Sequence, residues 1–184
     1  MKRTIKKSIP IPPGIEARIK EREIFIKGPL GELSNSFKLR KNVKMEKAQD
    51  KIEISCEKAT KKEKKMINTV VSKINNMIRG VQKKYEYELQ ICSIHFPITV
   101  KIENGKFIIS NFVGENKERS VAIKPGVDVK IEGDIVKVSS IDKEKAGTMA
   151  ASIETASKIV GYDRRVFQDG IWIIKKEKGR MRND

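Results

Sequence analysis

An internal repeat with a period of about 83 residues constrains the fold of this chain more than any other feature of its sequence. The matching segments, first copy and then second, are 15–19 with 98–102, 24–26 with 107–109, and 30–32 with 113–115. After one extra residue in the second copy, Val43 and Met45 match Val127 and Val129. A repeat of this length holds a whole small domain, whereas solenoid repeats are shorter.

Each copy begins with short segments in which apolar and polar residues alternate, separated by tight turns, as is typical of antiparallel strands. The first copy then changes to an apolar residue at every third or fourth position. The members of this stripe are Ile67, Val70, Val71, Ile74, Met77, Ile78 and Val81. The pattern predicts one amphipathic helix, opened by a Thr60–Glu63 capping box and ended by a left-handed cap at Gly80.

The second copy repeats the change of period with a thinner apolar stripe. Its members are Met149, Ile153, Ala156 and Val160. Asp142 is the expected N-cap, and Gly161 is expected to end the helix. The fold class predicted from both copies is α+β, with two tandem copies of a small antiparallel β-sheet packed on one α-helix.

One further strand, near residues 85–94, has alternating Tyr85, Tyr87, Leu89 and Ile91. The repeat pattern would let this strand close the first domain, and a preference for short connections would let it open the second. We assign it to the second. The predicted organisation is a first repeat at 1–84, a second at 85–177, and a basic tail at 178–184.

The net charge of +16, from 40 Lys and Arg against 24 Asp and Glu, points to a polyanionic partner. A membrane surface is the weaker candidate, because the sequence contains no anchor and no run that approaches the roughly 20 apolar residues needed to span a bilayer. The amino terminus lacks the apolar region of a signal peptide. Cys56 and Cys92 form no Cys-x-x-Cys and are expected to be small buried thiols in a reducing cytoplasm.

The inventory of catalytic groups is poor. His95 is the only histidine, which excludes His-pair metal sites, and no Gly-x-Ser-x-Gly elbow or phosphate-binding glycine loop is present. We expect His95 to make a hydrogen bond at a strand end. The chain is therefore predicted not to be an enzyme, and an RNA-modifying enzyme is the weakest hypothesis.

The two halves carry their basic residues differently. Residues 1–94 have a net charge of +12 and residues 95–184 of +4, but the surplus of the second half gathers near its end. Its members are Arg164, Arg165, Lys175, Lys176, Lys178, Arg180 and Arg182. Paired arginines on a turn can fork onto phosphates, and a basic tail can become ordered on RNA. Gln168 and Asp169 either hydrogen-bond RNA or simply form a β-turn that ends at Gly170.

A lysine-rich face on the first predicted helix is the other basic surface. Its members are Lys61, Lys62, Lys64, Lys65 and Lys73. Such a face is more often solvated than bound, so we expect less RNA contact there. With ten aromatic residues in the chain, shape and backbone recognition of folded RNA is favoured over base stacking as the main mode.

Several motifs occur together in an order that resembles one known family. In the second half they are His95-Phe96-Pro97-Ile98, Asn111-Phe112-x-Gly114-Glu115, Pro125-Gly126-Val127, and the run 163–171. In the first half they are Ile26-Lys27-Gly28-Pro29-x-Gly31 and Asn76-Met77-Ile78-x-Gly80-Val81. From about residue 9 to 176 the chain resembles large-subunit ribosomal protein six (universal L-six), in its archaeal and eukaryotic cytosolic branch.

The resemblance implies tandem sheet-plus-helix domains that bind large-subunit rRNA chiefly through the second copy. It places the protein in the cytoplasm, in the large ribosomal subunit, near the stalk base and the sarcin–ricin region. It also implies neighbouring ribosomal proteins, nearby translation factors, no cofactor, no catalysis, no membrane and no DNA. The predicted rRNA contacts are Arg164, Arg165, Gln168, Asp169, Lys175, Lys176, Lys178 and Arg180.

A free-standing basic nucleic-acid-binding module is the alternative hypothesis, because composition alone does not separate it from a ribosomal protein. One departure from the family pattern is Trp172, where relatives often have Tyr. An indole can donate one hydrogen bond, and the sequence leaves open whether Trp172 faces RNA or core.

Overall fold

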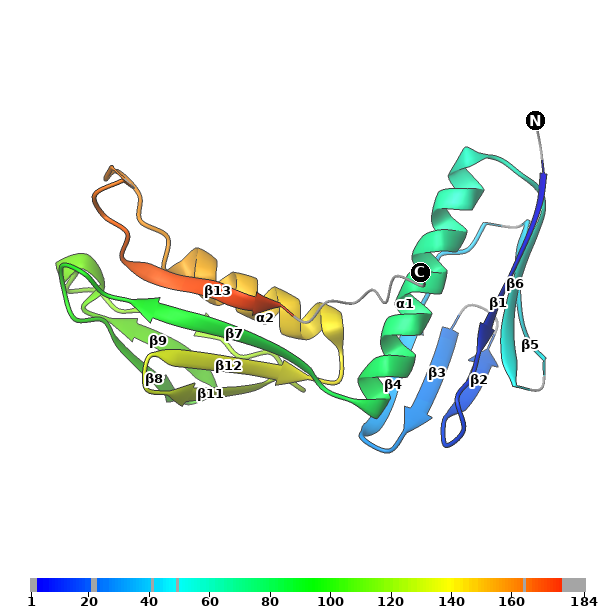
Figure 1. Cartoon of the computed structure of the whole chain (residues 1–184), viewed down its shortest axis with the longest axis horizontal. Helices are drawn as coiled ribbons and strands as arrows, with labels where there is room; N and C mark the ends of the chain where they lie inside the picture. Colours follow the sequence, from blue (N-terminus) through cyan, green and yellow to red (C-terminus); the bar gives the residue numbers. More distant parts are fainter. Residues whose placement is uncertain (1–2, 21–22, 41, 49, 164, 177–184) are drawn as a thin grey trace. The chain divides into compact units, whose positions relative to one another are not determined.

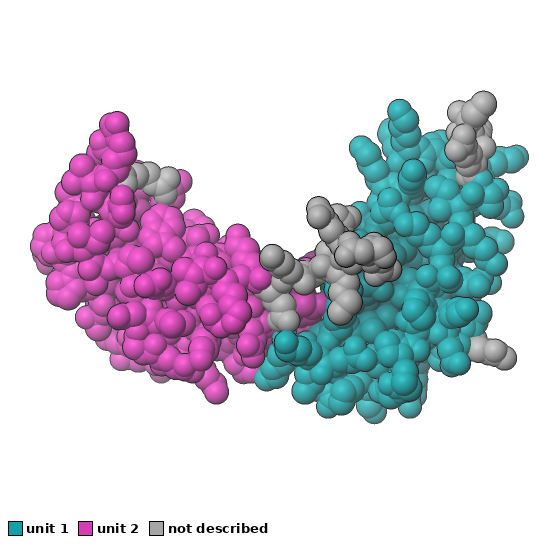
Figure 2. Space-filling model, viewed as in Figure 1, with its two compact units in different colours: residues 1–84 teal, residues 85–184 magenta. Residues whose placement is uncertain are grey.

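The computed structural model describes residues 3–20, 23–40, 42–48, 50–163 and 165–176. The chain divides into two compact units, residues 1–84 and residues 85–184 (Figure 2). Each unit has a separate cluster of buried apolar side chains and is described by itself.

The described part of the first unit contains six strands and one long helix (Figure 1). In chain order they are β1 (Arg3–Pro10), β2 (Glu16–Lys20), β3 (Glu23–Gly28), β4 (Gly31–Ser36), β5 (Val43–Ala48), β6 (Lys51–Ala59) and α1 (Lys61–Gln82). The strands form two antiparallel three-stranded sheets, in the orders β1-β6-β5 and β2-β3-β4.

The second unit repeats this plan (Figure 1). Its elements are β7 (Tyr85–Cys92), β8 (Thr99–Glu103), β9 (Lys106–Ser110), the 3-10 turn η1 (Phe112–Gly114), β10 (Arg119–Ala122), β11 (Asp128–Glu132), β12 (Ile135–Ser140), α2 (Lys143–Ala156) and β13 (Gly170–Lys176). The sheets have the orders β10-β9-β8 and β11-β12-β7-β13, and all strand pairs are antiparallel. The predicted α+β class with tandem copies is confirmed, and each copy divides its strands between two sheets.

Each core is built from the alternating strand residues and the apolar face of one helix. In the first unit Ile24 and Ile26 of β3 are fully buried, as are Ile67 and Ile74 of α1. Gly28 leaves no room for a side chain, because an added Cβ would lie 2.7 Å from Val81 Cγ2. In the second unit Met149 and Ile153 of α2 are fully buried.

Strand β7 opens the second unit. It lies beside β12 as β1 lies beside β6, so β7 is the counterpart of β1 in the repeat. Tyr85, Tyr87 and Leu89 are buried in the second core, and this packing explains why β7 belongs to the second unit and not to the first. β13 pairs with the other side of β7, where the described part of the first unit has no equivalent strand next to β1.

Both predicted helix starts are confirmed. Thr60 accepts a hydrogen bond from the Lys62 amide, and its own amide donates to Glu63 Oε2 at 2.9 Å, which completes the capping box. Asp142 Oδ1 accepts from the Glu144 amide at 2.9 Å at the start of α2.

The predicted cap at Gly80 is wrong. Helix α1 continues to Gln82, and its C-cap is Lys83 in extended conformation. The helix continues past Gly80 because Val81 is fully buried in the first core and its carbonyl oxygen accepts a hydrogen bond from the Leu30 amide. The stabilisation from packing Val81 outweighs the small helix penalty of one glycine.

The predicted end of the second helix at Gly161 is also wrong. Helix α2 ends at Ala156, and Val160 is an exposed loop residue rather than part of the apolar stripe. The helix ends early because Arg119 from β10 donates to the Ala156 and Lys158 carbonyl oxygens, at 2.8 and 3.0 Å. The same guanidinium lies 4.3 Å from the ring centre of Phe112. A tertiary cap of this kind leaves no local sequence signal.

Candidate functional site

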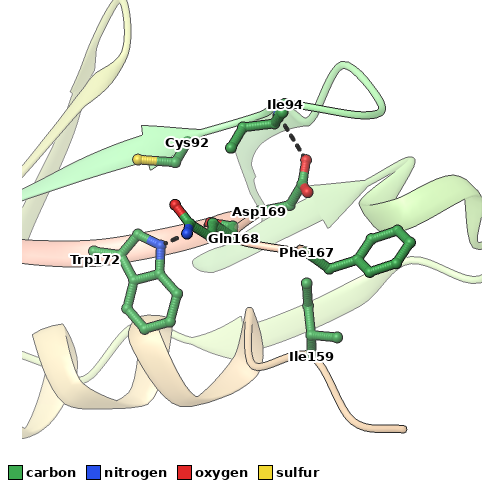
Figure 3. A pocket seen from close by; sticks show the side chains of 7 residues that line it. All are labelled: Cys92, Ile94, Ile159, Phe167, Gln168, Asp169 and Trp172. Carbon is green, nitrogen blue, oxygen red and sulfur yellow. Dashed lines mark hydrogen bonds between the residues drawn. The ribbon is translucent and has the colours of Figure 1, made fainter. Parts of the chain in front are cut away.

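The candidate site lies where β7 ends and β13 begins, between the loop 93–98 and the loop 157–169. Asp169 is its anchor, with a side chain only 1% exposed. Asp169 Oδ1 accepts hydrogen bonds from the backbone amides of Ile94 and His95, at 2.6 and 3.0 Å. Asp169 Oδ2 lies 2.7 Å from His95 Nδ1. The carboxylate therefore ties the loop before β13 to the loop after β7 (Figure 3).

Burial alone would raise the pKa of Asp169, but the hydrogen bonds from His95 and Ile94 outweigh it and lower the pKa to about 2. A depressed carboxyl pKa contributes stability that is present above the unfolded pKa, near 4, and is lost as pH falls through about 2. A difference of this size corresponds to about 2 kcal/mol.

We therefore expect wild type to lose about 2 kcal/mol more unfolding free energy between pH 6 and pH 2 than Asp169→Asn loses. Urea denaturation at a series of pH values measures this difference. Because other carboxylates titrate equally in both proteins, the difference isolates Asp169. Parallel pH curves for the two proteins would contradict the assignment.

The aromatic side chains of the two loops hold each other in place. The His95 ring stacks on the Phe167 ring, with ring centres 4.5 Å apart, and the Tyr162 ring packs on Phe167 as well, with ring centres 4.8 Å apart. The prediction that His95 makes a hydrogen bond at a strand end is confirmed, with Asp169 as its partner.

Arg165 is exposed, and its guanidinium already has a partner. Its Nε and Nη2 donate to the two carboxylate oxygens of Asp163, at 3.2 and 3.0 Å. These bonds lower the pKa of Asp163. An exposed ion pair stabilises by only ~0–1 kcal/mol, so a phosphate can take the place of this carboxylate at little cost.

Gln168 is also exposed, and its carboxamide nitrogen lies 3.4 Å from the Arg165 carbonyl oxygen. The backbone carbonyl oxygen of Gln168 accepts a hydrogen bond from the indole Nε1 of Trp172 at 3.3 Å. Trp172, about one third exposed, lies over the Cα of Gly170, with indole atoms at 3.1–3.2 Å from where a Cβ would stand. The indole is thus a surface group packed on backbone, not a core residue.

Lys175 and Lys176 lie near the end of β13, and both are exposed. Lys175 Nζ bonds to Glu88 Oε1 at 2.6 Å, and this bond raises the pKa of the lysine. A register shift between Ile173 and Lys175 places Lys175 opposite Glu88 of β7. The other predicted contacts, Arg164, Lys178 and Arg180, lie outside the described residues.

The buried edge of β13 is the feature that the sequence did not reveal. Ser157 Oγ accepts from the Ile171 amide at 2.9 Å, and Glu154 Oε1 accepts from the Ile173 amide at 3.2 Å. Side chains from the end of α2 thus occupy amides that an edge strand would otherwise expose. The only sequence signal for these hydrogen bonds was Ser157 itself, a polar residue in the segment that follows the helix.

The model of the family "Ribosomal protein L6" matches residues 11–84 and 96–170, which covers both copies of the repeat. The chain belongs to this family. The resemblance inferred from the ordered motifs is confirmed.

Curated relatives support the same assignment. A protein of Sulfurisphaera tokodaii is 42% identical over 169 residues, covering 92% of this chain and 91% of the relative. One from Methanobrevibacter smithii is 40% identical over 173 residues, covering 94% and 97%. One from Saccharolobus solfataricus is 39% identical over 173 residues, covering 94% and 96%. All three are named "Large ribosomal subunit protein uL6".

Metal-binding clusters and membrane-spanning helices are absent from the described residues. No group of three or more His, Cys, Asp or Glu side chains there could hold a metal ion. Within the same part of the chain, neither helix is both long and apolar enough to cross a bilayer.

Proposed function

We propose that this protein is a structural component of the large ribosomal subunit in the cytoplasm. In this role it binds large-subunit rRNA, near the stalk base and the sarcin–ricin region, and supports translation without catalysis of its own. The observation that carries the proposal is the family match across both repeats. The net charge of +16 supports a polyanionic partner.

The second unit is proposed as the main rRNA-binding domain, followed by the basic tail at 178–184. The support is the asymmetry of the repeat. β13 and the loop before it extend the second sheet beyond the plan of the described first unit. They carry most of the proposed contacts, which are Arg164, Arg165, Gln168, Lys175, Lys176, Lys178 and Arg180.

Asp169 has a different role within this proposal. Its buried carboxylate is fully used by Ile94 and His95, so it positions the loop that presents Arg165 and Gln168. The neighbouring ribosomal proteins and the translation factors are proposed to meet other surfaces of the assembled subunit.

Sedimentation tests the proposal. The tagged protein, expressed in an archaeal host, should run with the large subunit at low salt and leave it only at high salt, because phosphate contacts weaken as salt rises. The small subunit and a tagged unrelated basic protein are the controls. Recovery of the protein free at low salt, or on DNA, would favour a free-standing nucleic-acid-binding module instead.

A further inference from the structure

A pocket of about 350 Å³ opens at the end of the four-stranded sheet of the second unit (Figure 3). It is lined by Cys92, Ile94, Ile159, Phe167, Gln168, Asp169 and Trp172. This volume lies at the lower end of the range for small-molecule sites and suits a ligand about as large as one nucleobase with its sugar. The walls are mostly apolar, and few polar groups reach into the pocket.

The walls of the pocket are fixed before any ligand arrives. Asp169 joins its two loops, Phe167 is held by its stack on His95, and the Trp172 indole is held by the bond to Gln168. A preorganised aromatic surface loses little side-chain freedom when a flat ligand packs against it. The aromatic residues of the chain are few, but Phe96, Tyr162, Phe167 and Trp172 all belong to this end of the second unit.

Gln168 supplies the polar group that a base edge requires. A carboxamide carries both a donor and an acceptor, so it can pair with a Watson–Crick edge. Its existing contact with the Arg165 carbonyl oxygen is long, at 3.4 Å, and is easily exchanged. The Asp169 carboxylate, by contrast, is satisfied by the protein.

Charge favours RNA over an apolar protein side chain as the occupant. Exposed Lys158 directly precedes the lining residue Ile159, and exposed Arg165 lies two residues before the lining residue Phe167, so cationic residues are close in sequence to the lining of the pocket. Apolar or aromatic faces beside cations are the usual arrangement for a nucleotide whose base is unstacked and whose phosphates lie at the rim.

We propose that this pocket binds one unstacked nucleobase of RNA. The proposal rests on the proposed function and deepens it, because it adds a base-binding subsite to a surface otherwise expected to contact phosphates. Recognition of the shape and backbone of the RNA would still provide most of the affinity. The pocket would determine the position on the RNA at which the protein binds.

Trp172, the only tryptophan, reports directly on the pocket. The test uses the full chain with an RNA octamer containing all four bases, and with the same octamer made of abasic riboses. We expect the intact octamer to change Trp172 emission and to bind about tenfold more tightly than the abasic one, since base stacking provides about that difference. Equal binding of the two octamers would overturn the proposal.

Two pocket variants complete the test. Cys92→Leu narrows the pocket, and Gln168→Ala removes its exposed polar group. Each should remove most of the tenfold preference, whereas Ile174→Ala, which removes an exposed apolar group of β13 outside the pocket, should keep it. Thermal unfolding selects the variants that fold, and exposed Gln168→Ala remains informative if Cys92→Leu does not fold. Unchanged preference in the folded pocket variants would overturn the proposal.

The sedimentation experiment separates this proposal from the proposed function. If the pocket is wrong and the function right, the protein sediments with the large subunit but binds the intact and the abasic octamers equally. If the function is wrong, the protein does not sediment with the subunit, whatever the octamers do.

Discussion

Asp169→Ala is expected to lower the unfolding free energy of the second unit by about 3 kcal/mol, since each buried donor left without a partner costs about 1–3 kcal/mol. The substitution removes the acceptor of the Ile94 amide, the His95 amide and the His95 ring together. Urea denaturation followed by Trp172 emission measures the effect, because the only tryptophan lies in this unit.

The matched control is Asp163→Ala. Asp163 is an exposed aspartate in the same loop, and within the described residues its side chain accepts hydrogen bonds from Arg165 alone. We expect this control to cost under about 1 kcal/mol. Asp169→Asn should be intermediate, because the amide oxygen can still accept one bond but the charge is lost. Equal losses for the two alanine variants would show that Asp169 does not hold the loops together.

The double substitution Arg164→Ala with Arg165→Ala is expected to weaken rRNA binding about tenfold or more near physiological salt, and to flatten the salt dependence by about two units of slope. The reason is the loss of two phosphate contacts on the turn before β13. Arg164 lies outside the described residues, so its part in this prediction rests on the sequence. Binding to large-subunit rRNA across a salt series measures both quantities.

The comparison variant removes Lys61, Lys62, Lys64 and Lys65 together. It deletes four positive charges instead of two, so a purely general electrostatic attraction would make it the weaker binder. We expect it to bind better than the arginine variant. A larger loss from the lysine variant would move the main rRNA contact to the first unit.

Local patterns in the sequence were enough to predict the strands, the two helices and the residues at which the helices begin. Strand alternation, the change to a helical period and the capping residues Thr60 and Asp142 depend only on near neighbours, and all are found in the structure. The helix ends were not predictable in this way. Val81 extends α1 because it is buried, and Arg119 ends α2 from a strand some 37 residues away in sequence.

The candidate site shows the same division. Arg165, Gln168 and Asp169 are close in sequence, and the sequence therefore predicted the same role, rRNA contact, for all three. The structure separates them by burial. Asp169 is inside and bound to residues 74 and 75 positions earlier, while Arg165 and Gln168 are exposed. Hydrogen bonds over such separations have no local signature.

The sequence by itself determined the duplication, the α+β class and the family, because repeats, periodicity and ordered motifs are all properties of the chain as written. Only the tertiary structure decided that β7 opens the second unit and that β13 extends its sheet. It also decided that a buried carboxylate joins two loops around a pocket. These features depend on which distant segments pack together, and packing is decided by burial and by hydrogen bonds between residues far apart in sequence.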